Sequence, residues 1–191
     1  MAKKKSNQSS VVVSIILIAL AVLTICSLFM SAISIKTITD NIITGESVSV
    51  SSIKGTEVLS ALFNGEASSD LSAGTNLLIA LKTGDHVFVT NLFMWTYMLA
   101  VAVSVLSLVF AILRMVGLKF RLLNTLLGTA WIVLAFIAFI FGIVVAAQFS
   151  TEAGGINGLL TGKNVGYIAF GVYCLLGSIL GGILQLASSR K

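Results

Sequence analysis

The sequence predicts an all-α integral membrane protein in which four transmembrane helices form an up-down-up-down bundle, with a small mixed outer segment between the first two helices. The chain has 191 residues, of which 57% are hydrophobic and only 10% are charged. A soluble domain of this length cannot bury so much apolar surface. Four long stretches without charge give the number of helices, and the distribution of Lys and Arg gives their orientation.

Each of the four uncharged stretches is long enough to cross a bilayer once. They are residues 11–35, 87–113, 122–151 and 164–189. Crossing the hydrocarbon core takes about 20 residues at about 1.5 Å rise per residue. The chain contains no proline, the usual cause of kinks, so straight helices are expected. We expect the first stretch to be retained, because it is longer than the roughly 7 to 15 apolar residues of a signal peptide.

The charged residues divide between two sides of the predicted bundle. The tails 1–10 and 190–191 and the turn 114–121 contain eight Lys and Arg residues and no acid. The segments 36–86 and 152–163 contain four Lys residues and all seven acidic residues. Because short basic loops stay in the cytoplasm, both termini are predicted to be cytoplasmic in a multi-pass plasma membrane protein. The basic inner face predicts contact with anionic lipid headgroups, and the net charge of +5 is therefore no sign of nucleic-acid binding.

Residues 36–86 are the only part of the chain with a soluble-like composition. The alternation of Ser and Val over 47–51 predicts a short strand. Thr56 is predicted to cap a short helix that ends at Asn64-Gly65, and a second helix is predicted from about Asp70 to Lys82. The segment is too small to hold a core alone, so we expect it to pack on the outer ends of the helices. The outer segments hold no cysteine and no Asn-x-Ser/Thr acceptor, which favours a bacterial membrane.

Each predicted span carries small or hydroxyl residues at steps of three and four, which places them on one helix face. Such faces let helices pack closely in lipid, and they could also line a polar route. No span contains Asp, Glu, Lys, Arg or His, so packing is the favoured interpretation. The residues are Thr24, Ser27, Ser31 and Ser34; Ala100, Ser104, Ser107 and Ala111; Ala138, Gly142 and Ala146; and Gly171, Cys174, Ser178, Gly182 and Gln185.

The residue types that carry most enzymatic chemistry are scarce. His86 is the only histidine, beside Asp85 at the predicted outer face, which excludes a bis-histidine site within one chain. Cys26 and Cys174 form no Cys-x-x-Cys motif, although their similar predicted depths would let them approach if the first and fourth spans adjoin. We predict no catalytic, cofactor or metal site and no enzyme.

Aromatic residues occur near the predicted outer ends of two spans. Phe93, Trp95 and Tyr97 belong to the second span and Tyr167 to the fourth. Amphipathic rings prefer the membrane interface, so an aromatic belt is the expected arrangement.

The stretch Gly154–Asn164 resembles a phosphate-binding loop because it contains Gly162-Lys163. A Walker loop needs Gly at 157 and Ser or Thr at 164, and both positions hold Asn. The loop also follows a predicted membrane span instead of a strand. We therefore predict no nucleotide partner.

The layout of four spans, internal termini and a long first outer segment is similar in outline to the claudin-like tetraspan proteins. The first outer segment of that family carries a Trp-based motif and a cysteine pair, whereas residues 36–86 contain neither Trp nor Cys. The resemblance covers topology only and assigns no functional residue.

These observations predict a non-catalytic tetraspan protein that acts by contact, as a scaffold, an accessory subunit or an adhesion element. Its contacts would use the outer segment and the helix faces, and its partner would be another membrane protein or further copies of itself. The alternative is a channel or facilitator subunit for a small neutral or lipid-like solute, with the Ser, Thr and Gly faces lining the route.

Overall fold

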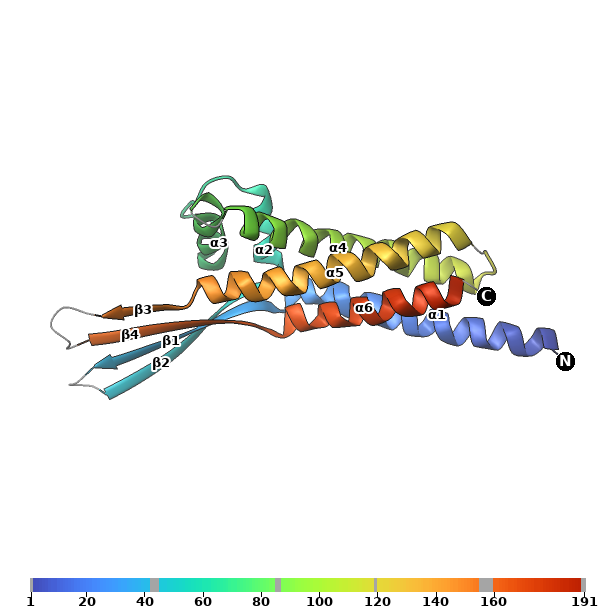
Figure 1. Cartoon of the computed structure of the whole chain (residues 1–191), viewed down its shortest axis with the longest axis horizontal. Coiled ribbons are helices and arrows are strands. Elements are labelled where there is room, and N and C mark those ends of the chain that lie inside the picture. The colour runs from blue at the N-terminus through green and yellow to red at the C-terminus, as the bar shows by residue number, and fades with distance from the viewer. Residues whose placement is uncertain (1, 42–44, 85–86, 119, 155–159, 190–191) are drawn as a thin grey trace.

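A computed structural model describes residues 2–41, 45–84, 87–118, 120–154 and 160–189. Over these residues the protein is mostly helical, with six α-helices and one four-stranded sheet (Figure 1). His86 and Asp85, which the sequence analysis singled out, lie outside the described residues.

Four of the described helices are long and apolar enough to cross a membrane, over Val11–Phe29, Val87–Met115, Arg121–Gln148 and Phe170–Ser189. They belong to α1 (Ala2–Cys26) with the short 3-10 helix η1 (Ser27–Phe29), to α4 (Val87–Met115), to α5 (Arg121–Gln148) and to α6 (Phe170–Ser189). Each packs mainly against two others, in the cyclic order α1, α4, α5, α6. The prediction of four long apolar helices is confirmed.

Two predicted spans extend well beyond their helices at the ends nearer the sheet. The first was placed over 11–35, but α1 ends at Cys26 and strand β1 (Ser31–Asn41) begins soon after η1. The fourth was placed over 164–189, but strand β4 (Leu160–Ile168) precedes α6. Both stretches lack charge, yet β-branched residues dominate 33–39 and two glycines interrupt 160–168, and both features disfavour a helix.

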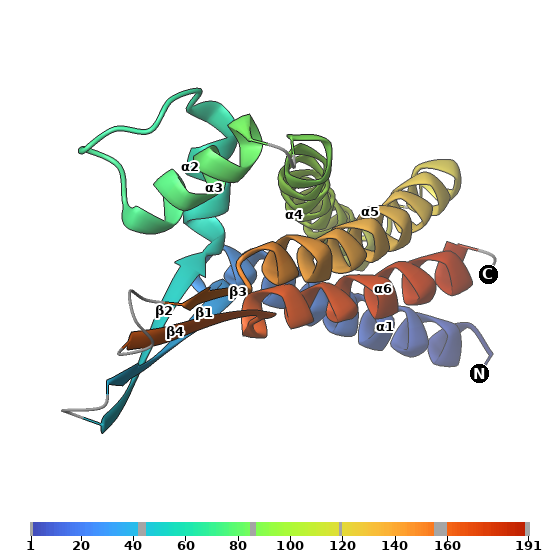
Figure 2. The same cartoon turned by 60° about the vertical axis from the view of Figure 1, so that its left-hand side comes forward.

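The sheet has the strand order β2-β1-β4-β3, and all of its pairs are antiparallel. Strand β2 (Gly45–Lys54) contains the predicted strand 47–51, and the short β3 (Thr151–Gly154) lies at the other edge. Thus much of the predicted loop 152–163 is strand, while residues 155–159 lie outside the described part. In Figures 1 and 2 the sheet extends beyond the long helices at one end of the molecule, and the α4–α5 turn lies at the other end with the first residues of α1 and the last residues of α6.

The helices α2 (Gly55–Phe63) and α3 (Ala73–Thr83) lie beside the end of α4 that is nearer the sheet (Figure 2). The N-cap of α2 is Lys54 and not Thr56, because Glu57 accepts a hydrogen bond from the Lys54 backbone N–H at 2.7 Å. The helix ends in an extended Asn64, without a left-handed glycine. Ser72 caps α3 by accepting from the Thr75 N–H, so this helix begins later than predicted.

Lys82 ties α3 to the end of α2. Its ammonium group donates hydrogen bonds of 3.1 to 3.2 Å to the carbonyl oxygens of Ala61, Leu62 and Asn64. These carbonyls lack helical partners at a C-terminus, and a cation is favourable there.

Replacing Lys82 with Met should destabilise the contact between α2 and α3 by about 2 kcal/mol, because hydrogen bonds from a charged donor are lost. Limited proteolysis should then cut residues 64–72 faster than in the wild type, while Lys82→Arg should retain protection. Equal cleavage of wild type and Lys82→Met would contradict this capping role.

Candidate interaction surface

A close three-way contact attaches the sheet and α2 to the long helices. Tyr97 on α4 donates a hydrogen bond to the Ser27 carbonyl at 3.0 Å, and its hydroxyl lies 3.0 Å from the Ser27 hydroxyl. Gly55, at the start of α2, packs so closely here that an added Cβ would lie 2.5 Å from the Tyr97 hydroxyl. The Gly55 N–H also donates to the Met30 carbonyl at 3.1 Å. The short segment that follows α1, the start of α2 and the helix α4 therefore hold one another in place.

The hydrophobic core is continuous across this contact. Buried residues of the sheet base, of α2 and α3 and of α4 to α6 form one cluster. The sheet, α2 and α3 are therefore packed on the long helices, as the small size of segment 36–86 predicted. Among the cluster's members are Ile33, Ile53, Leu78, Phe93 and Leu175, all less than 2% exposed.

One face of the sheet carries apolar side chains beyond its buried base, together with charges of both signs such as Lys36 and Glu46. The register pairs Ile38 with Val48 and Lys36 with Val50, so these four residues share a face. Val48 and Val50 are 51% and 60% exposed. Tyr167 of β4 lies on the same face, because its register partner is Ser34.

The opposite face of the sheet carries hydroxyl and amide groups. Thr37 pairs with Ser49 on one side and with Asn164 on the other, and Thr39 pairs with Ser47. Val48 and Val50 of β2, Ile38 of β1 and Tyr167 of β4 on one side and Ser, Thr and Asn on the other make the sheet amphipathic. The sequence analysis recognised this alternation for β2 but assigned part of β1 and part of β4 to membrane spans.

The small and hydroxyl residues that the sequence placed on one face of each span are buried against neighbouring helices. Thr24 and Ser178 join α1 to α6 through a 2.7 Å hydrogen bond between their hydroxyl groups. Ser107 donates to the Gln185 side chain at 3.1 Å, which joins α4 to α6. Ser31 and Ser34 differ, because they lie in β1. The buried set on α4, α5 and α6 is Ala100, Ser104, Ser107, Ala111, Ala138, Gly142, Ala146, Gly171, Cys174, Ser178, Gly182 and Gln185.

Glycines bring α5 and α6 into near backbone contact. A Cβ added to Gly182 would lie 2.6 Å from the Gly128 carbonyl oxygen. One added to Gly181 would lie 2.6 Å from Cζ3 of Trp131, which is fully buried. Helices associate in lipid through close approach of this kind. It leaves little space between the small-residue faces.

The two cysteines lie on the adjacent helices α1 and α6, which was the condition stated for their approach, and both are free. The Cys174 sulfur lies 3.8 Å from the Met30 sulfur. Among the described residues no group of three His, Cys, Asp or Glu side chains could hold a metal ion.

The predicted aromatic belt is wrong for two of its four members. Phe93 and Tyr97 are buried in the core, at 0% and 1% exposure, while Trp95 and Tyr167 are exposed. Tyr97 is buried because its hydroxyl finds partners on Ser27. Tyr167 belongs to β4 and not to a helix.

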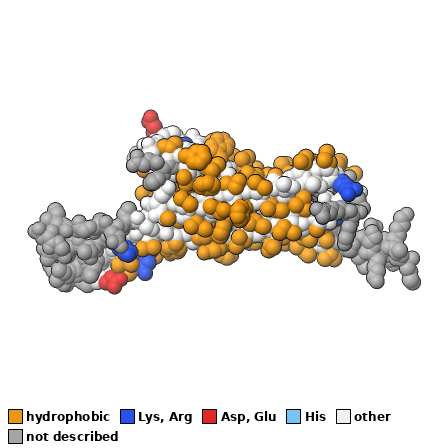
Figure 3. All heavy atoms as spheres, in the orientation of Figure 1, with side chains coloured by type: hydrophobic (Ala, Val, Ile, Leu, Met, Phe, Trp, Pro, Cys, Tyr) orange, Lys and Arg blue, Asp and Glu red, His pale blue; other side chains and the backbone are white. Residues whose placement is uncertain are grey.

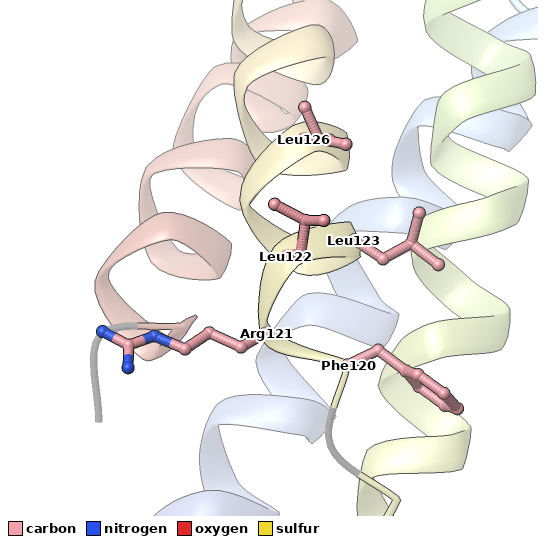
Figure 4. Close-up of a pocket in the computed structure, with 5 residues that line it drawn as sticks. All are labelled: Phe120, Arg121, Leu122, Leu123 and Leu126. Carbon is pink, nitrogen blue, oxygen red and sulfur yellow. The ribbon is translucent and has the colours of Figure 1, made fainter.

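A shallow hollow of about 220 Å³ lies at the start of α5, at the end of the molecule away from the sheet (Figure 4). Phe120, Arg121, Leu122, Leu123 and Leu126 line it, and the guanidinium of Arg121 points away from the leucines. Exposed leucines beside a cation suit the boundary between acyl chains and headgroups.

Comparison of the chain with protein-family models, with curated proteins and with solved structures finds no match. The functional argument therefore depends on the chain's own residues.

Proposed function

We propose that the chain crosses the plasma membrane four times as an up-down-up-down bundle, and that it acts by contact through its outer elements. The sheet and the helices α2 and α3 lie outside the cytoplasm, and both termini and the α4–α5 turn lie inside. The protein is then a scaffold, an accessory subunit or an adhesion element, and not an enzyme.

The distribution of side chains supports this orientation. Hydrophobic side chains cover the visible face of the helical part, and Lys and Arg side chains lie toward its two ends (Figure 3). The tails and the turn 114–121 hold eight cations and no acid, whereas every acid lies in the segments that form the outer elements or precede α4. The positive-inside rule places the acid-free end in the cytoplasm.

The observation that carries the contact function is the amphipathic sheet. It extends beyond the helices, it is fixed to them by a shared core, and it exposes Val48 and Val50. Phe63 at the end of α2 is 66% exposed as well. Exposed apolar side chains on a rigid element outside the lipid are typical of a surface that binds another macromolecule.

The channel alternative has less support. Its route would need space between the small-residue faces, where Gly128 and Gly182 allow near backbone contact and Trp131 occupies the interior. The hydroxyl and amide groups on these faces bond to one another or to backbone carbonyls, for example Ser107 with Gln185. Packing accounts for them without a solute.

Affinity purification in mild detergent, followed by mass spectrometry, tests the proposal. The expected result is a partner in stoichiometric amount, or self-association that depends on the outer elements. A chain that purifies without partner or self-association and conducts a small solute in liposomes would contradict it and support the channel alternative. A Gly182→Leu variant is a suitable control for nonspecific flux, because it disturbs the helix contacts and leaves the outer surface unchanged.

A further inference from the structure

The free edge of β2 carries an inference that rests on the proposed function and names the partner. β2 is the outermost strand of the sheet on one side, and it contains 10 residues. The opposite edge, β3, has only four residues. Residues 46–52 of β2 are all exposed, so its outer row of backbone N–H and C=O groups lies open along this length.

Edge strands are usually protected against pairing with another chain by proline, by a central charge, by a bulge or by shortness. Strand β3 is short, but β2 has none of these devices in its exposed part. The chain has no proline, the five residues from Ser47 to Ser51 are uncharged, and the one irregularity between β1 and β2 lies at Ser31/Ile33, near the helices. An edge left open in this way suits addition of a further strand.

The sequence of the exposed strand is complementary to itself. Ser47-Val48-Ser49-Val50-Ser51 reads the same in both directions. In an antiparallel pair centred on Ser49, Val48 of each copy faces Val50 of the other, and serine faces serine on the opposite face. Glu46 then faces Ser52 of the second copy, one diagonal step from Lys54, which long side chains can span. The pair therefore gains two matching valine contacts and two opposite-charge contacts by symmetry.

We propose that β2 pairs with β2 of a second copy of this chain in a facing membrane, so that two sheets join into one of eight strands. The two-fold axis of such a pair is perpendicular to the sheet and reverses the strand direction. Because the sheet and the long helices extend along the same axis of the molecule (Figure 1), the two sets of helices lie at opposite ends. The protein is thus an adhesion element that joins two membranes.

Two copies in one membrane cannot use this edge in the same way. Their β2 strands would run in the same direction around a two-fold axis parallel to the strands. Each backbone N–H would then lie opposite the same N–H of the other copy, and no regular ladder of hydrogen bonds could form. Only the facing arrangement satisfies both the symmetry and the hydrogen bonding.

The size of the contact determines the spacing of the two membranes and the strength of the adhesion. In the register centred on Ser49, the two-fold axis lies five residues from Lys54, where β2 ends beside the helices, so the two sets of helices lie about 35 Å apart. Each cross-strand pair contributes about 0.2 to 1 kcal/mol, so one contact is weak. Many copies on two facing surfaces bind strongly through multivalency.

Vesicle aggregation with charge variants of Ser49 tests the proposal. Ser49 faces its own symmetry mate, so Ser49→Lys places two like-charged side chains directly opposite, with their Cβ atoms about 5 Å apart. This is closer than the roughly 8 Å Debye length at 0.15 M salt, so the repulsion persists there. Proteoliposomes with wild-type protein should aggregate, and those with Ser49→Lys or Ser49→Glu alone should remain dispersed. Mixing the two variant populations, each with its own dye, should restore aggregation in clusters that contain both dyes.

A control variant and a cross-linking experiment show whether aggregation depends on this pairing of β2. Ser69→Lys adds the same charge to an exposed position outside the sheet and should aggregate like the wild type. In a background with Ser at positions 26 and 174, Ser49→Cys should form a disulfide dimer across aggregated vesicles. Ser47→Cys should do so only when mixed with Ser51→Cys, because a disulfide needs Cα atoms about 4.4 to 6.8 Å apart.

Dispersed wild-type vesicles, or aggregation of Ser49→Lys vesicles at the wild-type rate, would overturn the pairing of β2. If affinity purification still returned a stoichiometric partner of another kind, the contact function would stand and only this partner would be wrong. If it returned no partner and the chain conducted a solute, the proposed function would fall too.

Discussion

Replacing Gly166 with alanine should destabilise the protein by at least about 3 kcal/mol, the upper part of the range for overpacking. Gly166 lies in β4, where the strand crosses the end of α5, and an added Cβ would overlap the Ala146 carbonyl oxygen. Its N–H also donates to the Ser150 hydroxyl at 3.0 Å. Because the obstructing atom belongs to a helix backbone, it cannot move aside as a flexible side chain would. The melting temperature in mild detergent measures the effect.

Gly65→Ala is the matched control for Gly166→Ala. No heavy atom lies within 4 Å of the position that its Cβ would occupy. Its effect should stay within about 1 kcal/mol, because only the flexibility of the unfolded chain changes. Equal melting temperatures for the Gly166→Ala variant and the wild type would show that β4 does not lie against α5 as described.

Replacing Trp131 with alanine should cost about 3 to 5 kcal/mol, the usual range for emptying a fully buried aromatic site. Trp131 is 0% exposed and packs with Leu17, Ala21 and Ala111 of α1 and α4. Trp131→Phe should cost much less, because it keeps most of the ring and removes an indole N–H that has no hydrogen-bond partner among the described residues.

Gly181 provides a coupled test of the Trp131 prediction. Gly181→Ala should lower the melting temperature of the wild type, because the new Cβ would lie 2.6 Å from the Trp131 ring. In the Trp131→Ala background the same change has free space and should be tolerated, so the two substitutions are not additive. Additive effects in this double-mutant cycle would contradict the contact.

The parts of the fold that depend on local pattern could be predicted from the sequence. Helical spacing placed Ser104, Ser107 and Gln185 on packing faces, and all three are buried. The alternation around Ser49 predicted a strand, and it is the middle of β2. Both patterns are repeats within a few residues, which is the range over which sequence determines an element directly.

The parts that depend on distant contacts could not be predicted. Residues 31–35 and 164–168 are uncharged and were assigned to helices, yet 33–35 pair with 166–168 across the sheet. Their separation in sequence leaves no local sign of the pairing, although the Ile33 and Ile35 alternation was a signal for a strand. Tyr97 was assigned to a membrane-interface belt, but its hydroxyl bonds to Ser27, far away in the chain. These same contacts position the candidate surface, so the sheet face and its free edge emerged only with the structure.

The measurement that tests the account most directly is cysteine labelling of intact cells with a membrane-impermeant maleimide. The variants Ser49→Cys, Ser69→Cys and Val116→Cys, in a background with Ser at positions 26 and 174, place one exposed thiol in the sheet, before α3 and in the α4–α5 turn. We expect Ser49→Cys and Ser69→Cys to be labelled at once, and Val116→Cys to be labelled only after permeabilisation. Labelling of Val116→Cys in intact cells, or protection of Ser49→Cys until permeabilisation, would contradict an outward-facing sheet and the contact function built on it.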